Sequence, residues 1–342
     1  MTIYADNAAT TKLDIDAFEA MKPFLLDCYA NPSQPYSFSR KAKRAIKVAR
    51  ETIAECINAE PNEIFFTSGG TESDNWAIKN YCTQTDHRHI ITSCIEHHAV
   101  LNACKGTNHN SELFYLEVDS NGFVSQNDLK KVLYRPRECA TSCDSTLVSI
   151  MLANNEIVTI QPIKELAEIT HQYGACFHTD AVQAVGHIPV DVKDLGIHML
   201  SASAHKFNGP KGIGFLYNKH GILQPLHNGG SQEFGMRSGT ENVAAIVGMS
   251  VALKKNIDSI ADNTTYIESV SNAFISVLDS ANVDYILNGH HEHRLPGNVN
   301  ISIRGKSGES LLHLLDLKGI CISTGSACDS VNQQISHVIK AI

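Results

Sequence analysis

The 342-residue sequence lacks the features that mark several classes of protein. It has only 22 Gly and 10 Pro, too few for a collagen-like or low-complexity chain. No apolar run approaches the roughly 20 residues that a membrane-spanning helix needs, and no basic start followed by an apolar stretch opens the chain. We therefore expect a cytoplasmic protein that does not associate with membranes.

Basic charge is also scarce. Lys and Arg total 28 against 36 Asp and Glu, so the net charge is −8. A chain of this charge repels a phosphate backbone rather than neutralising it. Direct binding to nucleic acid is not expected.

The sequence lacks a disulfide framework and a complete set of metal ligands. Its ten cysteines are scattered without a CxxC pair, and most are predicted to be small buried apolar residues. The run HHEH at residues 290–293 has no second set of ligands nearby, so it predicts a solvated loop and no metal.

What the chain does contain is an alternation of strand-like and helical segments. Hydrophobic residues make up 43% of it, enough for a sizeable core. Strands are predicted at 63–67, 89–92, 147–151, 175–178 and 197–201, with helices such as 39–59 and 163–173 between them. This order predicts an α/β fold with a mostly parallel sheet wrapped by helices.

The length predicts a large domain with a second, smaller one, although a single barrel is the competing interpretation. After about residue 250 the sequence changes to a long helical stretch, Ala252 to Leu278, followed by a strand-like segment at 298–303. We place the large domain at residues 13–250. Residues 1–12 and 251–342 are assigned to a smaller α+β domain.

A lysine follows one predicted strand, in the segment SASAHK at residues 201–206. A lysine that its surroundings desolvate loses its proton more easily, and the neutral amine of Lys206 could then form a Schiff base with an aldehyde. A solvated loop lysine is the alternative interpretation.

Two further strand ends supply complementary groups. The segment SGGTESD at 68–74 precedes a predicted helix, so the backbone around Gly70 and Thr71 could hold a single phosphate, although a capped helix start is an equal alternative. Asp180 follows the strand at 175–178, where it could pair with a protonated pyridine nitrogen or simply cap a helix. Together with Lys206, these features predict a pyridoxal phosphate site.

Two other residues could act in such a site. His97 follows the strand at 89–92 and could stack on a cofactor ring and relay protons, although a structural histidine is the commoner outcome. Cys328 lies among Gly, Ser and Asp in the segment ISTGSACDS at 322–330, which favours a reactive thiol over a buried one.

The chain resembles the group I cysteine desulfurases, fold-type I pyridoxal phosphate enzymes of the class V aminotransferase group. The resemblance covers nearly the whole chain in eight segments in the family's order. These are YADNAATT at 4–11, NPS at 31–33, the phosphate loop at 68–75, Glu96-His97, NNEI at 154–157, HTDAVQ at 178–183 with SAHK at 203–206, MRSGTEN at 236–242, and SAC at 326–328.

This resemblance implies a role for each matching position. Lys206 would bind the cofactor, His97 would stack on its ring, and Asp180 would pair with the ring nitrogen. The remaining contacts are implied for Asn155 and Gln183 at the phenolic oxygen, for Gly70, Thr71, Ser203 and His205 at the phosphate, and for Thr240 at the phosphate of a neighbouring subunit in a homodimer.

The resemblance also implies an activity, in which L-cysteine becomes L-alanine and its sulfur forms a persulfide on Cys328. That sulfur would pass to an acceptor protein such as an iron–sulfur scaffold. A selenocysteine lyase or another class V aminotransferase would use the same lysine and aspartate, and a non-catalytic scaffold for iron–sulfur assembly is the alternative from a different class.

Some positions depart from the family's pattern. Asp329 lies beside Cys328, where a carboxylate disfavours the thiolate. The family's substrate-binding arginine lies well downstream of the cysteine, whereas the last arginine here is Arg304. We therefore expect the functional protein to be longer by some tens of residues, with Arg237 as the alternative partner for the substrate carboxylate.

Overall fold

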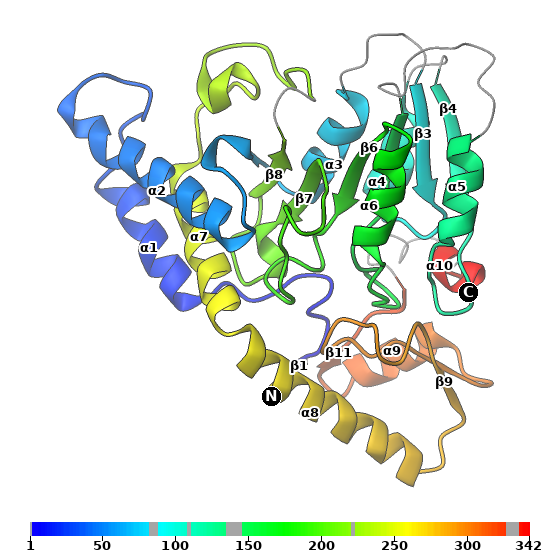
Figure 1. Cartoon of the computed structure of the whole chain (residues 1–342). Coiled ribbons are helices and arrows are strands. Elements are labelled where there is room, and N and C mark those ends of the chain that lie inside the picture. Colours follow the sequence, from blue (N-terminus) through cyan, green and yellow to red (C-terminus); the bar gives the residue numbers. More distant parts are fainter. Residues whose placement is uncertain (1, 82–87, 108–110, 135–145, 220–222, 326–334) are drawn as a thin grey trace.

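The structure is a computed structural model that describes residues 2–81, 88–107, 111–134, 146–219, 223–325 and 335–342 (Figure 1). Its centre is a seven-stranded sheet of order β2-β8-β7-β6-β5-β3-β4. The strands are β2 (Ile64–Thr67), β3 (Arg88–Ser93), β4 (Ser111–Leu116), β5 (Thr146–Ser149), β6 (Cys176–Asp180), β7 (Met199–Ser203) and β8 (Gly214–Asn218). Strands β3 to β7 pair in parallel, and only β8 runs antiparallel to its neighbours β2 and β7. The predicted α/β fold with a mostly parallel sheet is confirmed.

Helices cover both faces of this sheet (Figure 1). Helices α5 (Gln126–Tyr134) and α6 (Ile163–Gln172) lie on one face, and α3 (Gly70–Lys79) and α4 (His98–Lys105) lie on the other. Successive residues of a strand point to opposite faces of the sheet. Val148 and Phe177 pack in the cluster with α5 and α6, whereas Leu147 and Cys176 pack under α3 and α4. Burial on both faces explains why these strands are nearly continuous apolar runs in the sequence.

Three further helices flank the β2 side of the sheet. Helix α7 (Val243–Asp258) packs against α1 (Ile15–Leu26) and α2 (Arg40–Cys56). The α2 sequence places Ile46, Ala49 and Ile53 at helical spacing on its buried side. The prediction of helix at 39–59 is thus confirmed within a few residues at each end.

The remaining elements lie beyond one edge of the central sheet (Figure 1). They are α8 (Ile260–Ser280), α9 (Gly308–Asp316), α10 (His337–Ala341), an antiparallel pair of β9 (Tyr285–Leu287) with β10 (Ile301–Ile303), and a parallel pair of β1 (Ile3–Tyr4) with β11 (Ile320–Cys321). The division into two domains near residue 250 stays a prediction.

Two of the predicted elements are wrong in their extent. The helical stretch Ala252 to Leu278 is two helices, because Ser259 ends α7 and also begins α8, with a backbone N–H that turns back to Asn256. The strand predicted at 147–151 ends at Ser149, since the chain there leaves the sheet toward a turn held by Asn154.

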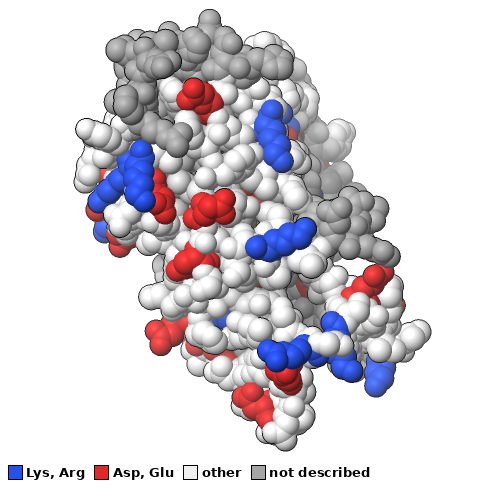
Figure 2. Space-filling model, turned by 90° about the vertical axis from the view of Figure 1, so that its right-hand side faces the viewer, with Lys and Arg blue, Asp and Glu red and all other residues white. Residues whose placement is uncertain are grey.

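Among the described residues, no helix is both long and apolar enough to cross a membrane. On the face drawn in Figure 2, acidic and basic side chains are interspersed rather than gathered by sign.

Candidate functional site

Lys206 lies just beyond the carboxyl end of β7, in the short 3₁₀ helix Ala204–Lys206. Its Nζ donates hydrogen bonds to the carbonyl oxygens of Ala8 and Ala9, the latter at 3.0 Å. The N-terminal segment therefore passes over the end of the sheet and receives the amine of Lys206. Ligands of open α/β sheets gather at such strand ends.

Asp180 ends the neighbouring strand β6 and is 5% exposed. Its Oδ1 accepts a hydrogen bond from the backbone N–H of Val182 at 2.9 Å. Burial raises the pKa of Asp180, and the nearby charges of His97 and Lys206 oppose that rise. The structure therefore brings the three residues Lys206, Asp180 and His97 within electrostatic reach of one another.

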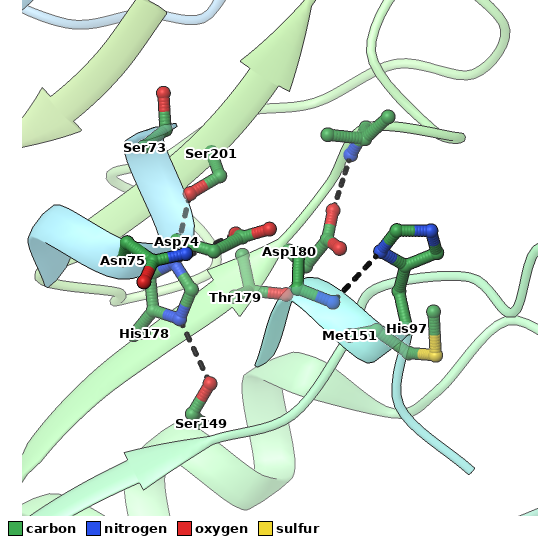
Figure 3. Close-up of polar contacts among 12 residues, drawn as sticks. Ser73, Asp74, Asn75, His97, Ser149, Met151, His178, Thr179, Asp180 and Ser201 are labelled. Carbon is green, nitrogen blue, oxygen red and sulfur yellow. Dashed lines mark hydrogen bonds and ion pairs between the residues drawn. The ribbon is translucent and has the colours of Figure 1, made fainter. Parts of the chain in front are cut away.

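His97 immediately precedes α4 and caps its N-terminus. Its Nδ1 accepts a hydrogen bond from the backbone N–H of Ala99 at 3.1 Å, so the proton of the neutral ring is on Nε2 (Figure 3). Burial lowers the pKa of His97, while the charge of Asp180 opposes that change. The sequence placed His97 after a strand but did not predict that its ring would be fixed as a helix cap.

The turn before α3 has the shape of an anion cradle. Gly69 adopts a φ of 149°, a conformation that favours glycine, and a Cβ at Gly70 would lie 2.6 Å from Cγ2 of Val182. Thr71 is exposed on the first turn of α3, and Ser203 lies beside both glycines from the end of β7. First-turn backbone N–H groups of a helix have no partner within that helix, so this turn can hold a phosphate.

Of three other predicted residues, two contact the N-terminal segment and one lies in the loop after β5. Gln183 donates from Nε2 to the carbonyl oxygen of Ala8 at 3.1 Å. The Nδ1 of His205 lies 3.2 Å from Oγ1 of Thr10. Burial lowers the pKa of His205 to about 4. Asn155 is half-buried in the loop after β5, where its carbonyl oxygen accepts a hydrogen bond from Asn298 at 3.5 Å. The structure thus places Gln183 and His205 at the N-terminal segment that also receives Lys206.

Thr240 lies on the exposed segment that leads into α7. With Thr67, Ser68 and Arg237 it lines a cavity of about 260 Å³. Arg237 forms a two-pronged ion pair with Glu72 of α3, at 2.9 and 3.3 Å, and Glu72 also accepts a hydrogen bond from the backbone N–H of Ser68. The guanidinium of Arg237 therefore already has a carboxylate partner, with which a substrate carboxylate would have to compete.

Cys328 lies outside the described residues, but the chain on either side of its segment is described. Gly325 lies against Glu156 and Ser336. After the segment, α10 buries Val338 against Ile95 and Ile157. Both flanks of residues 326–334 are therefore held near the loop that follows β5.

The run at 290–293 forms a loop in which His290 is half-buried and the other three residues are exposed. The Nδ1 of His290 accepts hydrogen bonds from the backbone N–H groups of Glu292 and His293. Within the described part of the chain, no three His, Cys, Asp or Glu side chains are arranged to hold a metal ion.

Sequence reasoning missed the partner of Arg237. In the sequence Glu72 is one residue of the segment SGGTESD, yet in the structure it connects the backbone of Ser68 to Arg237. The available signal was an acid in the first turn of a helix, which favours contact with that helix's N-terminal backbone. Nothing local predicts the arginine, which is far away in the sequence.

Comparison with known proteins agrees with this geometry. Residues 3–342 match the family described as aminotransferase class V. The chain is 49% identical to the cysteine desulfurase IscS of Dictyoglomus turgidum, covering 99% of this chain and 85% of the relative, and 46% identical to that of Methanosarcina thermophila, covering 99% and 83%. A solved NifS-like protein superposes with a TM-score of 0.88 at 36% identity, covering 100% of this chain and 89% of that one. The structure of SspA in complex with cysteine gives a TM-score of 0.82 at 34% identity, over 99% and 94%.

Proposed function

The chain belongs to the aminotransferase class V family, and from this premise we propose that it is a cysteine desulfurase that depends on pyridoxal phosphate. The observation that carries the proposal is the approach of Lys206, Asp180 and His97 at the carboxyl edge of the sheet, beside the Gly69–Gly70 turn. The relatives named cysteine desulfurase, up to 49% identical along the chain, support the choice of substrate.

The residues present fit the cofactor. The first-turn backbone N–H groups of α3, beside the hydroxyl of Ser203, suit a phosphate, and the buried carboxyl of Asp180 suits a ring nitrogen. When bound, pyridoxal phosphate supplies an aldehyde that captures an amino group and a ring that withdraws electrons from the substrate's α carbon.

Each of the chain's own groups then has a defined task. Lys206 would hold the cofactor aldehyde and, once displaced by the substrate, would remove the proton from the α carbon. Asp180 would keep a proton on the ring nitrogen, and His97 would cover the ring face with its Nε2 carrying a proton. The other contacts that we propose are Asn155 and Gln183 at the phenolic oxygen, and Gly70, Thr71, Ser203 and His205 at the phosphate.

We assign the sulfur transfer to Cys328. Its thiolate would attack the sulfur of L-cysteine, the C–S bond would break, and the electron pair would remain with the carbon that becomes the methyl group of L-alanine. The sulfur would stay on Cys328 as a persulfide until an acceptor protein, such as an iron–sulfur scaffold, takes it. The described cysteines are all free thiols, which suits work in the reducing cytoplasm.

We further propose a homodimer in which Thr240 reaches the cofactor phosphate of the partner subunit. Thr240 is exposed, as expected for such a contact. A group of large apolar side chains is also exposed on α1 and the segment after it, comprising Phe18, Leu25, Leu26, Tyr29 and Phe38. Exposed apolar groups of this kind mark protein interfaces.

The test of the proposed function is the fate of cysteine sulfur. The purified protein with pyridoxal phosphate should release L-alanine from L-cysteine and carry labelled sulfur on Cys328. Cys328→Ser should still bind the cofactor and cysteine but form no persulfide, whereas Cys321→Ser should behave as the wild type. Labelled sulfur on Cys321 would reassign the nucleophile, and the absence of alanine would refute the activity.

A further inference from the structure

A group of polar side chains lies buried between α3 and the sheet (Figure 3). Ser149 on β5, His178 on β6 and Ser201 on β7 are completely buried, and Asp74 on α3 is 1% exposed. The strand register pairs Ser149 with His178 and Asp180 with Ser201. Because residues two apart on a strand share a face, His178 and Asp180 both point to the α3 side of the sheet.

Three of these side chains form a hydrogen-bonded chain, and the fourth lies against it. The two ring nitrogens of His178 contact hydroxyl groups, with Nδ1 at 2.8 Å from Oγ of Ser149 and Nε2 at 3.0 Å from Oγ of Ser201. The Oδ1 of Asp74 lies 3.7 Å from Nε2 of His178 and has no hydrogen-bond partner among the described residues. The α3 carboxyl therefore contacts the β6 imidazole at the ring nitrogen that Ser201 also holds, next to Asp180.

Both ionisable members of this network, His178 and Asp74, are uncharged near pH 7. Burial lowers the pKa of His178 to about 3. Burial, and then the charge of Asp180, raises the pKa of Asp74 well above its ordinary value, so this carboxyl retains its proton. The other ionisable groups that act on Asp74 or Asp180 are Glu96, His97 and Lys206.

A polar network is unexpected in the layer between α3 and the sheet. The rest of the layer under α3 is apolar, including Trp76, Leu147 and Leu216. Replacing a buried polar set with apolar side chains is often neutral or stabilising, so global stability does not explain its presence. Hydrogen bonds are directional, so a buried hydrogen-bonded network holds the elements that contact it in a single relative position.

The elements joined here carry the two ends of the proposed cofactor site. Helix α3 begins with the phosphate turn at Gly70, one turn before Asp74, and β6 ends with Asp180. The geometry points to Asp74 as a positioning residue: through its contact with His178, which Ser149 and Ser201 hold between β5 and β7, it fixes α3 against β6 and so sets the turn at Gly70 relative to Asp180. This inference rests on the proposed function in that Asp180 is taken to meet the cofactor ring.

The experiment compares substitutions of Asp74 by two readouts, the dissociation constant of pyridoxal phosphate and the pH titration of the bound cofactor's absorbance. Asp74→Asn keeps a polar side chain of the same shape against His178 and should stay within about threefold of the wild-type dissociation constant. Asp74→Leu keeps similar bulk without polarity, and it should bind about tenfold more weakly. Its titration midpoint should rise by about one pH unit, because a poorly held ring proton no longer opposes protonation of the Lys206 nitrogen.

Two further variants serve as controls. Ser201→Ala removes only the hydroxyl that holds Nε2 of His178, so it tests the network even if Asp74→Leu fails to fold. The titration midpoint of Ser201→Ala should move in the same direction by a smaller amount. Thr179→Val is the matched control, since Thr179 is also buried on β6 but bonds to Ile150 on the opposite face. It should leave both readouts at their wild-type values.

Three outcomes would overturn the inference: wild-type titration and affinity in both Asp74→Leu and Ser201→Ala, equal impairment of Asp74→Asn and Asp74→Leu, or an equal effect of Thr179→Val. Alanine release by the wild type is measured in parallel. A wild type that binds the cofactor and shows the predicted shifts but releases no alanine refutes the proposed function and leaves the positioning role standing.

Discussion

The central sheet and the elements formed by residues 259–325 differ sharply in burial. Every residue of β5, β6, β7 and β8 is buried. By contrast, neither α8 nor α9 has a buried residue, and β9 and β10 are only half-buried. Along α8, Tyr266 is 70% exposed and Val277 is 65% exposed.

This difference explains where the candidate chemistry lies. Asp180 and Ser203 end buried strands, and Lys206 follows one directly, so close packing fixes their positions. The outer elements instead hold the chain near the segment that carries Cys328, through the pairing of β11 with β1. A rigid sheet end for the proposed cofactor and a separate support for the proposed nucleophile would suit a reaction in which sulfur must leave the site.

The largest expected effect follows from removing the amine at the sheet edge. Lys206→Ala should lower the rate of alanine release by at least about a thousandfold, since its amine is proposed both to hold the aldehyde and to move the proton. The absorbance of the cofactor bound to the lysine should also disappear. Lys211→Ala, an exposed lysine in the same loop, is the control. Full activity in Lys206→Ala would remove the sheet edge from the chemistry.

A smaller loss of rate is expected at the adjacent strand end. Asp180→Ala should retain some bound cofactor but lose about a hundredfold in rate, because an unprotonated pyridine is a poorer electron sink. Asp191 caps an exposed turn by accepting backbone hydrogen bonds from Lys193 and Asp194, so Asp191→Ala controls for the loss of such a cap. Steady-state kinetics with L-cysteine measures both, and matched rates would contradict the role of Asp180.

Stability measurements sharpen the comparison between the two regions. Phe177 on β6 is completely buried, so Phe177→Ala should lower the free energy of unfolding by about 3–5 kcal/mol. Val277→Ser on α8 should change it by no more than about 0.5 kcal/mol. Urea denaturation monitored by circular dichroism measures both values. A loss at Val277 comparable with that at Phe177 would show that α8 is covered in solution.

The smallest effect concerns acid sensitivity. Burial lowers the pKa of His178 from 6.5 to about 3, so between these pH values the unfolded chain binds a proton that the folded chain excludes. Stability therefore falls as the pH falls, by at most about 3 kcal/mol from this group at pH 4.5. His178→Asn should flatten this dependence, whereas His313→Asn on exposed α9 should not. Unfolding measured between pH 7 and 4.5 tests the slopes, and parallel curves for His178→Asn and the wild type would exclude the effect.

Much of the fold was predictable because its signals are local. The strands β2, β3, β6 and β7 lie where apolar runs predicted them, within two residues at either end. Strand β8 is not among the predicted strands, although its sequence GFLYN is an apolar run, and its antiparallel place between β2 and β7 has no local signal. Pairing of this kind depends on contacts between segments far apart in the chain, and a short apolar run does not specify its neighbour.

The candidate site also has features that the sequence predicts and features that it does not. Lys206, Asp180 and His97 could be chosen from the sequence because their chemical types follow strand-like segments. Their geometry could not, since the Lys206 amine meets the carbonyl groups of Ala8 and Ala9 from the opposite end of the chain. The roles of all the site residues, including Lys206, Asp180 and His97, stay predictions.

The sequence by itself determined the class of fold and the kinds of reactive group, because helical and strand periodicity and side-chain chemistry are properties of neighbouring residues. Only the tertiary structure decided the partners of those groups. It paired Arg237 with Glu72, placed Asp74 against His178, and set both contacts around the start of α3. Hydrogen bonds and ion pairs act over a few ångströms in space, so residues distant in sequence acquire them only when the sheet and its helices pack.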